Sequence, residues 1–349
     1  MLKINMLLTY PLLVILSIGK KSFEKMGKII GKSGDTVTRL LPDLQTSFSL
    51  TREVAKKIFR KKNKLFFIID DTLVKKISSQ FIEGTGLFFD TKIGRRITAF
   101  RAIFGMLSDG KFAIPIDVDY LFSKEIEEVI ENPQSKNQIA IALITLVKKL
   151  FPNTKIIVLA DGLYANIEML SWCKDNNIAA EMRMHSNRKV FYNGEKWKIK
   201  ELAEQKGIRL KGRKMARTLT VTWHKILLEL TIVRRFDKHR NETIVFQIAT
   251  YNATPHEHVE HYKKRWVIEK FFRTVKQELG LEQCFSRNFQ TQKNHAAAVC
   301  TAYTLAQLEM KKHKLKTPEE ALRRLKRKKV PPLISRFAFL NQLFPGVHA

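Results

Sequence analysis

The sequence predicts an α/β fold: a mixed sheet with flanking helices, a β-rich insertion, and a helical region at the N-terminus. Between residues 65 and 184, short runs of β-branched and aromatic residues alternate with longer helical patterns. Residues 188–243 instead hold short alternating segments separated by glycine and charge clusters. With 349 residues, 44% of them hydrophobic, the chain can build one large domain or two to three smaller ones.

Positive charge is spread along the whole chain. Lysine and arginine number 63 against 33 acidic residues, which gives a formal charge of +30. Self-repulsion at this charge opposes compaction, so we expect a polyanionic partner, nucleic acid before a membrane surface. Three cysteines without C-x-x-C spacing indicate neither a disulfide framework nor a structural zinc site, which fits a reducing cytoplasm.

The N-terminal region, residues 1–64, is predicted to be helical. Its apolar stretch 6–19 is short for a membrane span and contains Pro11, so we interpret it as a buried helix. Residues 22–41 predict two helices around a glycine-containing turn, either a helix-turn-helix or an ordinary αα-hairpin. In a helix-turn-helix the second helix, starting at Asp35, would present Thr36, Thr38 and Arg39 to DNA. Packing between the two helices is expected from Ile29, Ile30, Val37 and Leu40.

The first predicted strand, residues 65–74, carries two carboxylates, Asp70 and Asp71, in an otherwise apolar run. Buried charge is costly without a partner or a function. Residues 97–107 and 111–121 predict two more strands joined by a hairpin turn, so we expect three strands in succession. A basic run before residue 65 marks the boundary to the N-terminal region.

The fourth predicted strand, residues 154–160, ends directly before Asp161. In open α/β sheets, ligands and catalytic groups collect at the carboxyl ends of the strands, where Asp161 is expected to lie. The elements around it are predicted to be a helix at 135–151, a helix at 163–176 and a strand at 178–184. We take residues 65–187 and 244–290 as two parts of one core, interrupted by the insertion at 188–243.

A helix is predicted from Thr254 to Leu281, with Thr254 and Glu257 forming a capping box and Pro255 at its first position. Its core-facing stripe is expected to consist of Val267, Ile268, Phe271, Phe272, Val275 and Leu279. A polar stripe lies beside it, with Tyr262, Arg265, Glu269 and Lys276 on one side of the helix and Trp266 and Arg273 at its margin. Taken alone, this stripe could be a ladder of solvated salt bridges.

Three carboxylates, Asp70, Asp161 and Glu269, are expected to converge at one edge of the sheet. Oxygen ligands suit Mg²⁺ or Mn²⁺ rather than zinc. Two such ions about 3.5–4 Å apart are a standard means of in-line attack on a phosphodiester. The histidines at 256, 258 and 261 form no H-E-x-x-H pair, and we interpret them as surface residues or supports of the site. A C-terminal helical basic region, 291–349, completes the chain.

These blocks resemble the DDE transposases of bacterial and archaeal insertion sequences, in the class with an RNase H-like core and the signature Y-x2-R-x3-E-x6-K, the insertion sequence family four type. Tyr262, Arg265, Glu269 and Lys276 meet every spacing of the signature. Asp70 in IIDDT and Asp161 in VLADGLY complete the match, which covers roughly residues 65–285. The family also places a β-rich insertion between its second aspartate and its glutamate.

The resemblance implies metal-dependent cut-and-paste transposition, in which terminal inverted repeats are cleaved, by way of a DNA hairpin in some members, and joined to target DNA. It implies that Asp70, Asp161 and Glu269 hold two Mg²⁺ (or Mn²⁺) ions. The cations and the tyrosine of the polar stripe would grip phosphates, and Trp266 would stack on an extruded base. The implied partners are double-stranded DNA, at transposon ends and target, and a second copy of the chain in a synaptic homodimer, with no membrane. The expected location is the cytoplasm, at the nucleoid.

Three alternatives stay open at this stage. The D-x-T pattern favours Asp70 over Asp71, and neighbouring strand residues face opposite sides, so a slip of one position would exchange them. The chain could be a catalytically silent descendant that only binds DNA. It could also be a metal nuclease of the same core acting on other DNA structures.

Overall fold

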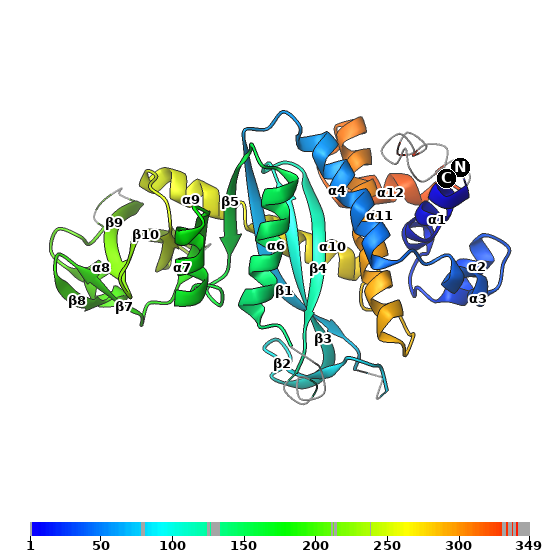
Figure 1. Cartoon of the computed structure of the whole chain (residues 1–349), viewed down its shortest axis with the longest axis horizontal. Coiled ribbons are helices and arrows are strands. Elements are labelled where there is room, and N and C mark those ends of the chain that lie inside the picture. The colour runs from blue at the N-terminus through cyan, green and yellow to red at the C-terminus, as the bar shows by residue number, and fades with distance from the viewer. Residues whose placement is uncertain are drawn as a thin grey trace.

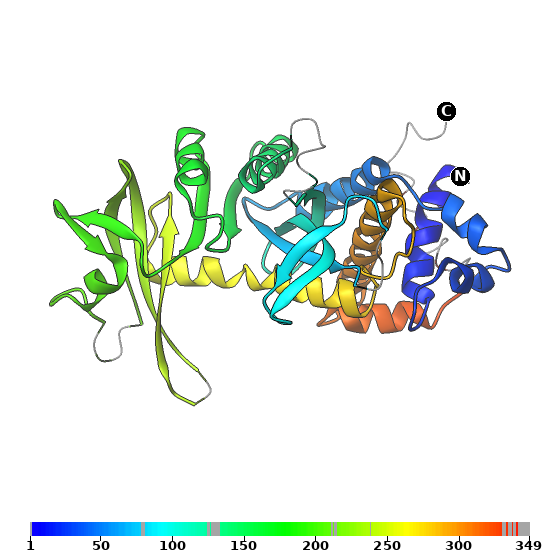
Figure 2. The same ribbon diagram turned by 90° about the horizontal axis from the view of Figure 1, so that it is seen from below.

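A computed structural model describes residues 2–77, 81–123, 126, 133–210, 212, 215–237, 239–329, 333, 337 and 340. The described strands form one 11-stranded mixed sheet, with helices on both faces (Figures 1 and 2). The α/β fold with a mixed sheet and flanking helices is confirmed. Beyond residue 329, most of the predicted C-terminal region lies outside the described residues.

The middle of the sheet positions both aspartates. Strand β1 (Lys64–Lys75) pairs antiparallel with β3 (Arg95–Ser108), and β3 pairs antiparallel with β4 (Ala113–Leu121). On its other side β1 pairs parallel with β5 (Lys155–Ala160), which pairs parallel with β6 (Ala179–Met184). The carboxyl ends of β1, β5 and β6 therefore share one edge.

A strand that the sequence analysis missed lies between the first two predicted ones. Strand β2 (Gly86–Asp90) pairs with the first half of β3, so the expectation of three strands in succession is wrong. Leu87 and Phe89 on β2 are 55% and 54% exposed. The strand shows no polar and apolar alternation because apolar residues occupy its solvent-facing positions as well.

The insertion extends the same sheet instead of forming a separate one. Strand β11 (Glu242–Ala249) pairs with β6 on one side and with β10 (Ile226–Phe236) on the other. Beyond β10 the order continues through β9 (Ala216–Trp223), β7 (Lys189–Tyr192) and β8 (Glu195–Lys198). A short helix, α8 (Ile199–Glu204), was not predicted in this β-rich segment.

Helices cover both faces of the core. Helix α6 (Lys136–Leu150) packs on one face of β1, β3 and β4, and α10 (Trp266–Gln277) lies on the other face (Figures 1 and 2). Helix α7 (Ile167–Asp175) contacts β6. It begins later than the predicted position 163, because Asn166 caps it by accepting a hydrogen bond from the backbone N–H of Met169.

Helices from the two ends of the sequence gather at one end of the molecule (Figure 1). They are α1 (Leu2–Leu16), α2 (Phe23–Ile29), α3 (Gly34–Arg39), α4 (Leu44–Phe59), α11 (Phe289–His313) and α12 (Pro318–Lys326). Residues 12–15 of α1 are fully buried, which confirms the interpretation of this apolar stretch as a buried helix. Within the described part of the chain, no helix combines the length and the hydropathy that crossing a membrane requires.

Helices α2 and α3 form the predicted helix pair, with one difference in its packing. Val37 is buried, but Ile29 is 40% exposed and does not pack between the helices as expected. Gly27 is buried in its place, and a Cβ there would lie 2.3 Å from the carbonyl oxygen of Lys32. The two backbones approach so closely that the contact needs a glycine.

Candidate active site

Asp70 and Asp161 occupy adjacent positions on neighbouring parallel strands. Ile69 of β1 pairs with Ala160 of β5, and each aspartate follows its strand's paired residue. Burial and the charge of Asp161 raise the pKa of Asp70 to about 7, although the Arg265 guanidinium acts in the opposite direction. The two carboxylates therefore repel each other at a site where a cation would stabilise both.

Asp71 faces the opposite side of the sheet. Its carboxylate forms ion pairs with Lys136 of α6 and with Arg101 of β3, the latter at 3.6 Å. Asp70 instead faces α10, where Arg265 donates a 2.9 Å hydrogen bond to its Oδ2. The structure thus assigns Asp70, and not Asp71, to the side of the sheet that carries Glu269.

The late helix is divided by a tighter turn. The sequence predicts one helix from residue 255, but the structure has α9 (Pro255–Lys263), capped as predicted by Thr254 and Glu257, and then α10. Between them the backbone N–H groups of Lys264 and Arg265 donate to carbonyls three residues back, those of His261 and Tyr262. This is 3₁₀ geometry, in which residues three apart eclipse, and it places the Arg265 guanidinium 5.9 Å from the centre of the Tyr262 ring.

Arg265 connects two of the carboxylates. It hydrogen bonds to Asp70 and to Oε1 of Glu269, one turn further along the helix. Among the described residues, no three His, Cys, Asp or Glu side chains gather closely enough to hold a metal ion. Asp70 and Asp161 fit a hard divalent cation by their oxygen chemistry and their repulsion, whereas Glu269 could join them only after Arg265 moves away.

One cleft of about 930 Å³ holds the whole predicted site. Its lining includes every residue predicted on the strands and the late helix: Asp70, Asp161, Tyr262, Arg265, Trp266, Glu269, Arg273 and Lys276. The candidate residues on α3 do not line it; there Thr38 and Arg39 are exposed and Thr36 is half-buried.

The stripe residues differ in their burial. Tyr262 is buried and donates a 3.2 Å hydrogen bond to the carbonyl of Ala160, directly before Asp161. Lys276 donates to the carbonyl of Leu73 at 2.6 Å, and burial lowers its pKa. Trp266 is 51% exposed, which leaves its indole ring available to a ligand.

The cleft is also lined by residues that the sequence analysis did not select as site residues: the cations Lys92, Arg183 and Arg235, together with His185. Arg183 is an exposed residue in the otherwise largely buried strand β6. A cationic residue in a predicted strand was the sequence signal that could have identified it. Arg235 comes from β10 of the insertion, and only the pairing of β10 with β11 brings that strand to the core. Its pKa is lowered by burial and by the nearby cations Arg183 and Arg265.

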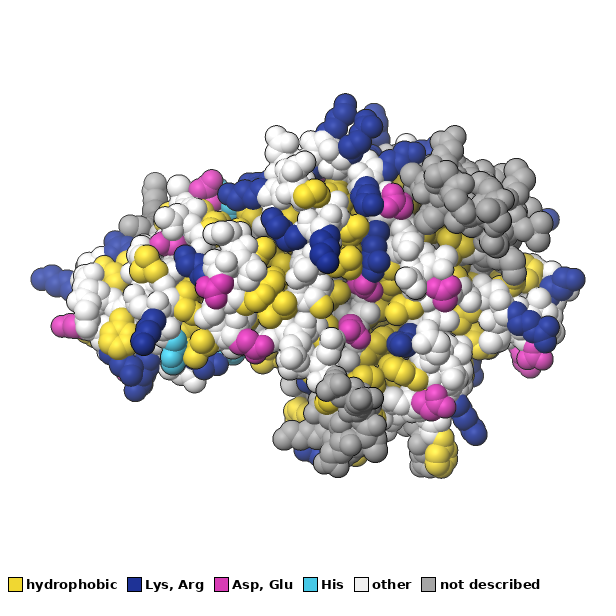
Figure 3. Space-filling model, viewed as in Figure 1, with side chains coloured by type: hydrophobic (Ala, Val, Ile, Leu, Met, Phe, Trp, Pro, Cys, Tyr) yellow, Lys and Arg dark blue, Asp and Glu magenta, His cyan; other side chains and the backbone are white. Residues whose placement is uncertain are grey.

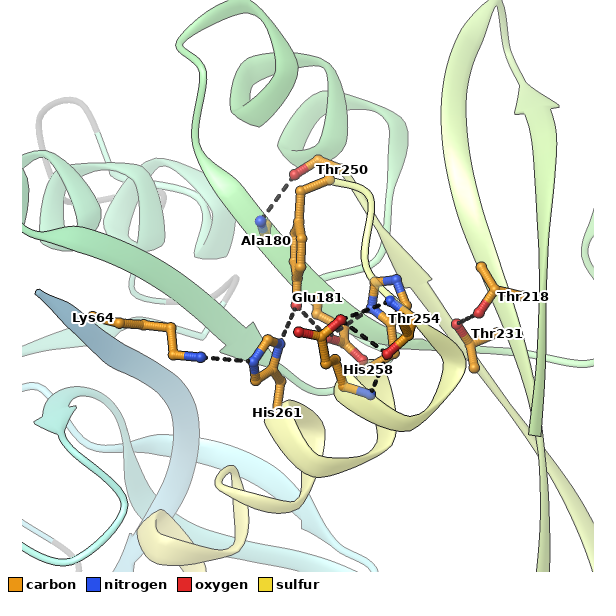
Figure 4. Close-up of polar contacts among 11 residues, drawn as sticks. Lys64, Ala180, Glu181, Thr218, Thr231, Thr250, Thr254, His258 and His261 are labelled. Carbon is orange, nitrogen blue, oxygen red and sulfur yellow. Dashed lines mark hydrogen bonds and ion pairs between the residues drawn. The ribbon is translucent and has the colours of Figure 1, made fainter. Parts of the chain in front are cut away.

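A buried polar network fixes α9 to the sheet (Figure 4). Oε2 of Glu181, on β6, accepts hydrogen bonds from the Tyr251 hydroxyl at 2.6 Å and from Nδ1 of His258 at 3.2 Å. The Tyr251 oxygen lies 2.9 Å from Nδ1 of His261, whose Nε2 lies 3.2 Å from Nζ of Lys64. Lysine can only donate, so Nε2 of His261 accepts and Nδ1–H donates to Tyr251.

Burial decides between the two interpretations of His258 and His261. Glu181 and His258 are fully buried and His261 is 8% exposed, so these two histidines are not surface residues, which leaves the interpretation as supports of the site. Burial and the neighbouring Lys64 lower the pKa of His261 to about 4, which keeps the ring neutral. The network anchors α9 to β6 and to the start of β1, and so holds Tyr262 against the end of β5.

Two carboxylates at the carboxyl edge of a mixed sheet, a third carboxylate on an apposed helix and a surrounding group of cations are the kinds of residue that metal-dependent phosphoryl transfer uses. A family model described as a transposase DDE domain matches residues 63–305. The chain belongs to this family, and its sheet is the RNase H-like fold of such domains. A search of curated proteins finds no match. The family carries out DNA transposition through phosphodiester hydrolysis and transesterification, binds DNA and generally uses divalent metal ions.

Proposed function

We propose that this chain is an active cut-and-paste transposase that cleaves terminal inverted repeats and transfers the freed strand into target DNA. The main support for this proposal is that Asp70, Asp161 and Glu269 come from three separate elements and line the same cleft. A protein that only bound DNA would have no need for three carboxylates among the cations of a DNA-binding cleft.

We assign Asp70, Asp161 and Glu269 the role of holding two Mg²⁺ or Mn²⁺ ions. When bound, such ions would activate the attacking oxygen and stabilise the leaving oxygen of the phosphodiester. Arg265 pairs with both Asp70 and Glu269, and its guanidinium can also bind a phosphate of the DNA.

The rest of the polar stripe binds the DNA. Lys276 and Arg273 contact phosphates near the cleaved bond, Tyr262 orients the end of β5, and the exposed ring of Trp266 stacks on an extruded base. We further propose that the chain is of the Y-x2-R-x3-E-x6-K class, the insertion sequence family four type. For this class we propose a hairpin intermediate, a homodimer that holds two transposon ends, and action on nucleoid DNA in the cytoplasm, with Thr36, Thr38 and Arg39 of α3 contacting DNA outside the cleft.

Cleavage of DNA that carries the flanking repeats tests the function. Purified protein should nick and join this DNA in Mg²⁺, and Glu269→Gln should reduce the rate by about 10³-fold or more while DNA affinity stays within a few-fold. Gel analysis of labelled strands measures the cleavage, and fluorescence anisotropy measures the binding. Undiminished cleavage by Glu269→Gln would remove Glu269 from the site.

The reaction should also depend on pH. The pKa of Asp70 is raised to about 7, so its carboxyl group is largely protonated below that pH. A divalent cation must displace this proton, and its affinity should fall by up to about tenfold per pH unit below 7. We expect the Mg²⁺ concentration needed for half-maximal cleavage to rise steeply from pH 7 to pH 5.5 and to change little above pH 8. A requirement for Mg²⁺ that is constant from pH 5.5 to 8.5 would contradict this assignment.

A further inference from the structure

A dense group of lysines lies at the edge of the sheet opposite to the candidate active site. We call this surface the basic edge and define it by the exposed residues Lys61, Lys62, Lys111, Lys149, Lys155 and Lys311. Figure 3 shows dark blue side chains gathered along the upper border of the molecule, where Figure 1 places the ends of α4 and α6 and the start of β5.

Several contacts join these lysines into one surface. Nζ of Lys62 lies 2.9 Å from Oδ2 of Asp109 in the turn between β3 and β4, next to Lys111. The backbone N–H of Lys155 donates to the carbonyl of Asn63. On the other side of the same turn, Nζ of Lys311 lies 5.9 Å from the ring centre of Phe112. The ends of α4, α6 and α11 and the starts of β1 and β5 thus meet here.

Few carboxylates neutralise the lysines of the basic edge. Asp109 pairs with Lys62, but no carboxylate among the described residues forms an ion pair with Lys61, Lys111 or Lys155. Lysines in the last turn of a helix offset the helix dipole, which accounts for Lys149 of α6 and Lys311 of α11. Lys111 and Lys155 lie in a turn and at a strand start, where a helix dipole does not explain them, whereas Lys61 directly follows the C-cap of α4.

The residue types on the basic edge favour binding to the phosphate backbone of a nucleic acid. None of the strongly exposed large apolar residues in the described part of the chain lies on the basic edge, and the Phe112 ring beside Lys111 and Lys311 is half-buried, so this surface presents little apolar area to unpaired bases or to a lipid bilayer. Clustered lysines without stacking groups bind duplex DNA through its phosphates and without regard to sequence.

The basic edge is separate from the cleft. Lys64, beside Lys155 in the sheet, lies six residues before Asp70 on β1, which at about 3.3 Å per residue gives roughly 20 Å. We propose that the basic edge is a second site for double-stranded DNA, which holds a duplex segment other than the one in the cleft. This inference rests on the proposed function for its partner, but its test does not require cleavage.

The test compares two triple charge reversals in EDTA, with a duplex of about 20 base pairs that lacks the repeats. One variant combines Lys61→Glu, Lys111→Glu and Lys155→Glu. Its matched control combines Lys200→Glu, Lys206→Glu and Lys225→Glu, three exposed lysines of the insertion. Anisotropy measures the affinity at several salt concentrations, and native mass spectrometry counts the duplexes bound per chain.

For the basic-edge variant, we expect the slope of log affinity against log salt to become shallower by about 2.7, at 0.9 per phosphate contact. Affinity near 0.1 M salt should fall on the order of 10²-fold, and the second duplex per chain should be lost. The control should change the slope by less than about 1. An unchanged slope in the basic-edge variant, or an equal loss in the control, would overturn the proposal.

These outcomes are independent of the proposed function. If the wild-type protein fails to cleave repeat DNA in Mg²⁺ but shows the expected binding in EDTA, the cut-and-paste assignment is wrong and the proposed second DNA site is supported. If the wild-type protein cleaves normally and the basic-edge variant binds duplex like the wild type, only the proposal of a second DNA site is wrong.

Discussion

Replacing Asp70 by asparagine is expected to abolish DNA cleavage in Mg²⁺, whereas the same replacement at Asp71 leaves the cleavage rate within a few-fold of wild type. Asp70 faces the cleft with Asp161 and Glu269. Removing its charge should cost the transition state about 4 kcal/mol or more, which corresponds to a rate loss of about 10³-fold. Single-turnover cleavage of labelled repeat DNA measures both rates.

The Asp71→Asn variant is a matched control that should have its own defect. Its carboxylate pairs with Lys136 and Arg101 on the opposite face of β1, with a side chain that is 14% exposed. Loss of these charge-assisted contacts should lower the free energy of unfolding by about 2 kcal/mol, which urea denaturation would show. If Asp71→Asn lost cleavage and Asp70→Asn kept it, the roles of the two aspartates would have to be exchanged.

Replacing Glu181 by alanine should produce the largest loss of stability among single changes near the site. The variant removes a fully buried carboxylate and leaves the Tyr251 hydroxyl and Nδ1 of His258 without their acceptor. We expect the free energy of unfolding to fall by about 3–5 kcal/mol, as when one partner of a buried pair is removed. Chemical denaturation followed by circular dichroism measures this change.

Glu260 supplies the comparison for Glu181. Glu260 lies on α9, and its ion pair with Lys263 is exposed, with the two side chains 41% and 57% accessible. Glu260→Ala should change the stability by no more than about 0.5 kcal/mol. Equal stability of the Glu181→Ala and Glu260→Ala variants would show that the buried network does not hold α9 in place.

Much of the fold and the cleft could be predicted because the sequence carries local signals for them. The apolar runs before Asp70 and Asp161 indicate buried strands, and the spacing of Tyr262, Arg265 and Glu269 indicates one helical side. All of these residues line the cleft in the structure. A local sequence pattern is enough to predict the position of a residue when that position depends only on the strand or helix that contains it.

The parts that could not be predicted depend on partners far along the chain. Glu181 lies in the predicted strand 178–184 and His258 in the segment HEHVEH, and neither pattern indicates full burial of these two side chains, which results from the packing of α9 on β6. Arg235 reaches the cleft through strand pairings that the sequence does not specify. The 3₁₀ turn at Lys264 and Arg265 has no signal either, since these residues and their neighbours are compatible with a continuous helix.

The continuous sheet from β1 to β10 sets the spacing between the core and the insertion. Backbone hydrogen bonds link β1, β5, β6, β11 and β10 without a break, so the insertion cannot rotate on a hinge relative to the core. The separation between Asp161 and Arg235 is set by the number of intervening strands, at about 4.8 Å per strand. Under the proposed function, a phosphate held by Arg235 of the insertion would lie at a distance from Asp161 that the strand pairings set, so the backbone, more than any single side chain, would determine where the DNA strand is opened.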